Sequence, residues 1–151
     1  MKNIKLLMPF SLIFMLLLGG CTSLDGRQLA SSAYKGKFYV EHQPKDSRDL
    51  HVNISQILNN RGLDAVYGEQ GQAPESAEFI VSYLDRWHWD MRMFLSNLRI
   101  EVRDKSNSEL IGFGESGQDS MAAMGKTFDD IINRSLDQML SNPDAQEYEI
   151  N

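Results

Sequence analysis

Two neighbouring stretches in which apolar and polar side chains alternate place the strongest constraint on the fold. Alternate positions are apolar in residues 78–90 and again in residues 93–104. An alternation with a period of two is typical of a β-strand that buries one face. The alternating apolar side chains are Phe79, Val81, Tyr83, Trp87, Trp89, Phe94, Leu98, Ile100 and Val102. We therefore predict a long β-hairpin with one face in the core, because a slip of one residue would bury charged side chains instead.

The same pattern predicts how three consecutive strands pair. A turn at residues 91–92 joins the first two strands, and a turn at residues 106–107 leads to a third strand at residues 109–116. The predicted pairs in the first hairpin are Trp89 with Phe94, Tyr83 with Ile100 and Val81 with Val102. Those in the second hairpin are Val102 with Ile111 and Ile100 with Phe113. Both hairpins then build one continuous apolar face, and this agreement supports the register.

Helical patterns precede and follow this meander. Residues 48–61 carry apolar side chains at helical spacing, and Thr127 is placed to cap a final helix. Residues 37–42 and 63–67 form short strands on either side of the first helix. The helix side chains expected to cover the sheet are Ile54, Leu58, Ile131 and Leu136. The predicted fold class is α+β: a β-α-β unit, a three-strand meander and a helix, with a mostly antiparallel sheet and two helices packed on one face.

The N-terminus carries the signature of an export signal. Two lysines precede a 13-residue, mostly apolar stretch at residues 6–18. This stretch contains Pro9 and is shorter than the roughly 20 residues that span a bilayer, so we predict a removed signal peptide. The Leu-Gly-Gly-Cys sequence at residues 18–21 resembles the lipobox of bacterial lipoproteins.

The lipobox resemblance implies cleavage between Gly20 and Cys21, followed by acylation of Cys21. Thr22 stands where an aspartate would favour retention at the inner membrane. The resemblance therefore implies a lipid anchor in the outer membrane, with the domain facing the periplasm. Cys21 is the only cysteine, so no intrachain disulfide is possible.

Removal of the signal leaves enough residues for one domain with a core. We divide the chain into a signal peptide (1–20), the lipidated cysteine with a flexible tether (21–36), a single α+β domain (37–141) and an acidic mobile tail (142–151). Both signal-peptide lysines leave on cleavage, so 13 basic and 21 acidic residues remain, a net charge of about −8. This balance argues against a nucleic-acid partner, which would need a basic surface.

The sequence contains no recognisable catalytic or metal-binding motif. His42, His51 and His88 lie on different predicted elements, and we predict no metal site and no cofactor. The predicted register places Asp85 and Glu115 about 9.5 Å apart on one face. That separation is at the upper limit of about 9.5 Å for an inverting glycosidase. A peptidoglycan-acting hydrolase is thus a distant alternative to a protein without enzymatic activity.

The end of the first hairpin is the strongest candidate for a binding surface. Its first strand would extend about 43 Å, whereas each helix covers only about 21 Å. The side chains beyond the reach of the helices are Trp87, Trp89, Met91, Met93 and Phe94. If exposed, such a cluster is typical of a partner-binding surface. If a helix end or residues 118–126 cover it, the cluster is ordinary core.

Three arginines gather on the opposite face of the hairpin, at positions 86, 99 and 103. Arg86, Arg99 and Arg103 either form a solvated face with Glu101 or contact an anionic headgroup or lipopolysaccharide phosphate. A protein partner and a lipid or lipopolysaccharide ligand therefore both remain as hypotheses.

The order of these elements is similar to that of a group of small bacterial lipoproteins of unknown function. The segments that carry the resemblance lie within residues 37–140 and read FYV, NNRGL, AEFIVSYLDRWHWDM, LRIEVRD and LIGFGES. The domain of this group resembles those of the lipopolysaccharide-assembly lipoprotein LptE and the N-terminal part of the curli-export lipoprotein CsgG. The resemblance implies an accessory or assembly role in the cell envelope.

Overall fold

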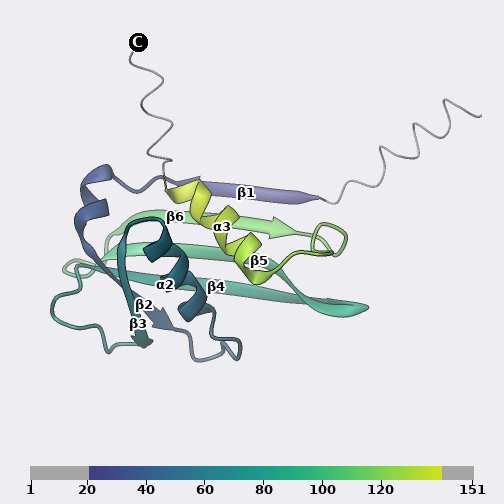
Figure 1. Cartoon of the computed structure of the whole chain (residues 1–151), viewed down its shortest axis with the longest axis horizontal. Coiled ribbons are helices and arrows are strands. Elements are labelled where there is room, and N and C mark those ends of the chain that lie inside the picture. The colour runs from purple at the N-terminus through teal and green to yellow at the C-terminus, as the bar shows by residue number, and fades with distance from the viewer. Residues whose placement is uncertain (1–20, 141–151) are drawn as a thin grey trace, which may run out of the picture.

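The computed structural model describes residues 21–140, which form one β-sheet with two α-helices on one of its faces (Figure 1). In chain order the elements are β1 (Thr22–Arg27), the 3-10 helix η1 (Ser31–Lys35), β2 (Lys37–His42), α2 (Leu50–Asn60), β3 (Asp64–Glu69), β4 (Phe79–Asp90), β5 (Arg92–Asp104), β6 (Leu110–Gln118) and α3 (Phe128–Met139). No helix in this part of the chain has the length and apolar content that crossing a bilayer requires. The predicted signal peptide and acidic tail lie outside the described residues.

The α+β class is confirmed, and the sheet is mixed, with the strand order β1-β6-β5-β4-β2-β3. β4, β5 and β6 form the predicted antiparallel meander, and β1 adds to β6 in antiparallel fashion. β2 pairs in parallel with both β3 and β4. The parallel β2–β3 pair follows from α2, because a helical crossover returns the chain in its original direction. The predicted arrangement is therefore right for the meander and incomplete elsewhere.

The inner face of the β4–β5 hairpin has the predicted register over most of its length. The confirmed pairs are Val81 with Val102 and Tyr83 with Ile100. All of these side chains are buried, as are the helix side chains expected to cover them: Ile54, Leu58, Ile131 and Leu136. Thr127 caps α3 as expected, through a capping box with Asp130. The alternation and the helical spacing thus identified the centre of the core correctly.

A β-bulge at Ser96 changes the register at the far end of this hairpin. The pairs on either side of the bulge are Arg86 with Asn97 and Trp87 with Leu95. Ser96 is the extra residue in β5, and its hydroxyl donates to the carbonyl oxygen of Arg86 at 2.9 Å. The predicted pairing of Trp89 with Phe94 is therefore wrong, because the bulge places Trp89 opposite Met93.

A second bulge, at Ile111, makes the predicted pairs between β5 and β6 wrong. The observed pairs are Val102 with Gly112, Ile100 with Gly114 and Leu98 with Ser116. The inward positions of β6 are therefore small, and this allows α3 to lie close to the sheet. A Cβ atom at Gly114 would overlap the carbonyl oxygen of Ser135 in α3. Phe113 lies on the outer face instead, with the Arg99 guanidinium 3.9 Å from its ring centre.

The prediction of a flexible tether over residues 21–36 is wrong, because most of this segment belongs to the folded domain. β1 pairs along β6, from Thr22 opposite Gln118 to Arg27 opposite Phe113. All six residues of β1 are exposed, so this edge strand has no apolar alternation by which the sequence could reveal it. The start of the described chain is therefore fixed to the sheet.

Candidate functional site

The candidate site lies at the end of the β4–β5 hairpin, where three of the five predicted binding side chains are exposed. Trp89, Met91 and Met93 expose 67%, 95% and 49% of their surface. Met91 lies between the two strands and has a left-handed backbone conformation, with φ 56°. This conformation is uncommon for a long side chain, and here it accompanies a side chain that extends into solvent.

The other two predicted binding side chains, Trp87 and Phe94, are packed against the rest of the domain. Phe94 is buried, and Trp87 packs against the core. The Trp87 ring has the Arg48 guanidinium 3.8 Å from its centre, and the Phe128 ring meets it edge-on. Its indole N–H donates to Asp85 Oδ2 at 2.5 Å. The binding hypothesis therefore no longer includes Trp87 and Phe94, which fit the alternative of ordinary core.

The segment between β6 and α3 adds further apolar side chains to this end of the molecule. Arg92 donates to the carbonyl oxygen of Ala123 at 2.6 Å, which holds this segment against the hairpin. We define the hairpin-end patch by its exposed side chains: Trp89, Met91, Met93, Met121, Met124 and Phe128. Exposed aromatic and methionine side chains grouped in this way are typical of a surface that contacts a partner or a membrane.

Cys21, the expected lipidation site, lies at the same end of the domain. Its backbone N–H donates to Asp119 Oδ2 at 2.7 Å, and the Asp119 N–H donates to the Cys21 carbonyl oxygen at 3.2 Å. Asp119 begins the segment that Arg92 holds against the hairpin. Figure 1 shows the start of β1, this segment and the tip of the hairpin on one side of the molecule. The thiol of Cys21 is free and exposed.

Two of the three arginines considered as contacts for an anionic ligand are already paired with carboxylates. Arg99 lies 2.7 Å from Glu101 and 3.1 Å from Glu115, and Arg103 lies 2.9 Å from Glu101. Arg86 is exposed at the edge of this network. The arrangement matches a solvated face of alternating charges, with little free positive charge for a phosphate group.

Stability is expected to depend on the ionisation of Glu101. Burial raises the pKa of this carboxyl, but hydrogen bonds from Arg99 and Arg103 outweigh that effect and hold the pKa below its ordinary value. Such a group stabilises the fold above its unfolded-state pKa of about 4.3, and this contribution is lost as the pH falls through the folded-state pKa. Glu101→Gln should therefore lower the free energy of unfolding by about 1–2 kcal/mol at neutral pH and by less in acid.

Urea denaturation at a series of pH values measures this difference. Glu109→Gln, at an exposed position, is the matched control and should leave the pH dependence of stability unchanged. A cost of Glu101→Gln that stays the same from neutral to acid pH would contradict the expectation.

Asp85 and Glu115 lie on opposite faces of the sheet, so the predicted carboxylate pair is wrong. Asp85 pairs with Leu98, whereas Glu115 pairs with Arg99. Consecutive residues of a strand point to opposite faces, and the shifted β5–β6 register therefore moves Glu115 to the outer face. The geometry on which the hydrolase alternative rested is not formed.

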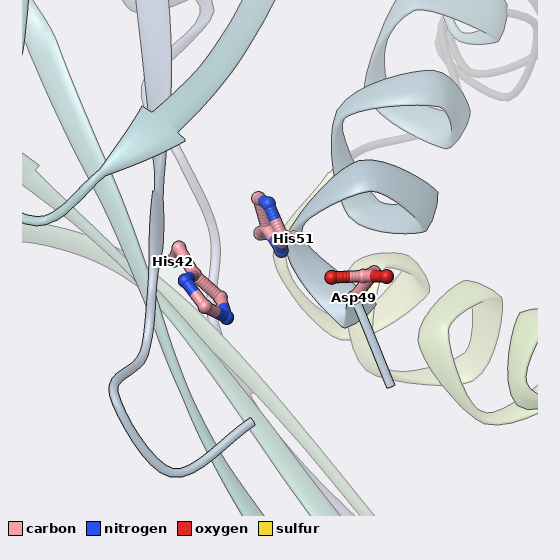
Figure 2. A group of neighbouring side chains, drawn as sticks. All are labelled: His42, Asp49 and His51. Carbon is pink, nitrogen blue, oxygen red and sulfur yellow. The ribbon is translucent and has the colours of Figure 1, made fainter. Parts of the chain in front are cut away.

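Two histidines that lie on separate elements in the sequence meet where β2 ends and α2 begins. The ring centres of His42 and His51 are 4.4 Å apart, and Figure 2 shows Asp49 beside them. A hydrogen bond with the Asp46 carbonyl oxygen raises the pKa of His42, while burial and the charge of His42 lower the pKa of His51. The sequence did not reveal this group, because His42 and His51 lie on a strand and a helix and not on one turn of the same helix. His88 stays apart, against Phe94.

The likeness of this chain to known proteins lies in its fold. No family model and no curated protein matches the chain. Among solved proteins, the chain is similar to two structures of PelC from Paraburkholderia phytofirmans. One is described as the PelC dodecamer and the other as the dodecamer of a leucine-to-methionine variant. In both cases the TM-score is 0.60 at 13% identity, and the match covers 79% of this chain and 99% of the PelC chain. At this identity the likeness shows a shared fold.

Proposed function

We propose that this chain is a non-enzymatic, lipid-anchored envelope protein that serves as a binding or accessory module for an outer-membrane or periplasmic assembly. One observation carries the proposal: Cys21, the expected site of acylation, lies at the same end of the domain as the hairpin-end patch. As expected from Gly20, Cys21 and Thr22, the mature chain would begin at the acylated cysteine and face the periplasm from the outer membrane.

The hydrogen bonds that fix Cys21 to the domain support an orientation in which the hairpin-end patch lies close to the membrane. A flexible tether would let the domain face in any direction, whereas the two hydrogen bonds between Cys21 and Asp119 leave little freedom. Each buried CH₂ of an acyl chain contributes about 0.8 kcal/mol to membrane binding, so two or more chains would hold this end at the bilayer. The patch would then lie within reach of a membrane-embedded partner, and confinement to the surface lets even a weak contact suffice.

A lipid or lipopolysaccharide ligand is the alternative. Aromatic and apolar side chains beside basic ones suit a membrane interface. Lys126 is exposed in the segment that contributes Met121 and Met124, and Arg86 is exposed on the opposite face of the hairpin. However, Arg99 and Arg103 are paired with glutamates, and the mature chain carries a negative net charge. We therefore favour a protein partner. Since the similar PelC structures are dodecamers, further copies of this chain are included among the partners to be tested.

Photo-crosslinking in cells from positions 89 and 91 tests the proposal. We expect both positions to capture a discrete protein partner, because Trp89 and Met91 are the most exposed side chains that the hairpin itself contributes to the patch. Position 84 is the control, since Leu84 is also exposed on β4 but lies outside the patch. Cys21→Ser should release the protein from the membrane fraction and abolish the crosslinks.

Three outcomes separate the hypotheses. Captured protein identifies the partner, whether a second copy of this chain or another protein. Crosslinks to lipid or lipopolysaccharide alone, weakened by salt, would favour the alternative. Capture from positions 89 and 91 that does not exceed capture from position 84, or a membrane fraction that retains the Cys21→Ser chain, would contradict the proposal.

A further inference from the structure

The group formed by His42, Asp49 and His51 has a geometry that the hairpin-end patch does not explain. One possible ligand atom from each residue lies within 4.8 Å of the other two (Figure 2). His42 is the last residue of β2, and Asp49 immediately precedes α2, in which His51 is the second residue. The turn between strand and helix thus brings together two imidazoles and a carboxylate, the side chains that bind divalent transition metals.

His51 supplies the first sign that this group has a ligand. Its side chain is buried, with 8% of its surface exposed. Its Nδ1 atom is inaccessible to solvent and has no hydrogen-bond partner among the described residues. A buried polar atom without a partner costs free energy, so such an atom needs an explanation. A metal ion bound at this nitrogen would remove that cost.

Asp49 supplies the second sign, because it occupies a cap position without capping. It has a left-handed backbone, φ 56° and ψ 37°, and its carboxylate makes no hydrogen bond to the helix. Asp46 performs that role instead, accepting the Leu50 N–H at 2.7 Å and the Arg48 N–H at 2.7 Å. The Asp49 carboxylate is therefore left exposed, and Figure 2 shows it beside the ring of His51.

We propose that His42, Asp49 and His51 together bind one divalent transition-metal ion of the zinc class. Two imidazoles and one carboxylate form a three-ligand set that leaves a fourth position for water. Calcium and magnesium would instead require a site built from oxygen atoms. Ligand atoms around tetrahedral zinc lie about 3.4 Å apart, so the present group has to contract by about 1–1.5 Å. The exposed Asp49 side chain can supply much of that movement.

Glu69 is placed to orient His42 in this site. Its Oε2 atom lies 3.4 Å from His42 Nδ1, while His42 Nε2 lies 3.1 Å from the carbonyl oxygen of Asp46. An Nδ1–H that donates to Glu69 leaves Nε2 as the metal ligand, and the metal then replaces the contact with the carbonyl oxygen. A carboxylate that accepts from a metal-bound histidine fixes its tautomer and ring orientation. Glu69 therefore acts as a positioning residue.

Zinc titration of the purified chain by calorimetry tests the proposal. A Cys21→Ser background is used so that the exposed thiol cannot bind the metal. We expect one zinc per chain and a rise in the thermal unfolding midpoint on zinc addition. Cobalt(II) at the same site should give visible absorption bands of a four-coordinate nitrogen and oxygen environment.

Substitutions identify the ligands. Asp49→Asn keeps a residue type that tolerates the left-handed backbone, so the variant should remain folded. We expect Asp49→Asn and His51→Gln each to weaken zinc binding by about 100-fold or more, and Glu69→Gln to weaken it by about 10-fold or more. His88→Gln, on the hairpin, is the matched control and should bind zinc like the parent chain.

The proposal is overturned if the parent chain binds less than one zinc, or if Asp49→Asn binds zinc as tightly as the parent. Equal weakening by His88→Gln would likewise overturn it, because the metal would then bind adventitiously. These outcomes do not depend on membrane attachment or partner capture, so they leave the proposed function to its own experiment.

Discussion

Gly114→Ala is expected to destabilise the domain by about 3 kcal/mol or more, the upper range for overpacking a well-filled interior. The added Cβ would overlap the carbonyl oxygen of Ser135, which is backbone within α3. A flexible side chain could move aside, but a helix backbone can retreat only if α3 separates from the sheet. The separation would expose Ile131 and Leu136, both fully buried in the folded protein.

Gly112→Ala is the matched control for this experiment. A Cβ at Gly112 would lie 3.2 Å from side-chain atoms of Met139 and 3.3 Å from Leu29. Methionine repacks readily, so we expect a loss of about 1 kcal/mol or less. Urea denaturation of the two variants compares them directly. Equal losses would contradict the view that the backbone of α3, rather than its side chains, limits the space above β6.

Ile100→Ala is expected to cost about 2–5 kcal/mol, as for other large-to-small changes at fully buried positions. The Ile100 side chain is 0% exposed and lies between Tyr83 on β4 and Gly114 on β6. Because its neighbour on β6 has no side chain, no nearby group on that strand can fill the cavity. Leu84→Ala, at a position 63% exposed, is the control and should change stability by about 0.5 kcal/mol or less.

The free energy of unfolding from urea denaturation measures this second effect. A loss near zero for Ile100→Ala would show that the inner face of the hairpin is assigned to the wrong side chains. Since Ile100 and Gly114 are direct partners, the double variant should deviate from the sum of the single losses.

Periodicity predicted the centre of the core because burial on one face leaves a regular trace in the sequence. Alternation assigned Val81, Tyr83 and Ile100 to the buried face, and helical spacing assigned Ile54 and Leu136. The β-α-β unit, the meander and the final helix followed in the right order. Each of these features depends on contacts that repeat along an element, so the pattern contains them without reference to the rest of the chain.

Register at the hairpin ends could not be read from the same pattern. The extra residues at Ser96 and Ile111 each shift the pairing by one position. A bulge has no periodic signature, and the choice of Gly114 over Phe113 for the inner face depends on how closely α3 approaches β6. β1 was missed for a related reason, since all six residues of this edge strand are exposed and its sequence shows no alternation.

For the candidate site, the sequence by itself determined which residue types gather at the hairpin end and marked Cys21 as the expected anchor. Only the tertiary structure decided that Trp89 is exposed while Trp87 is packed, and that Cys21 is fixed at the same end. It alone brought His42 and His51 together across a strand and a helix. The physical reason is that these outcomes depend on distances between segments far apart in the chain, which are set by packing that no local pattern encodes.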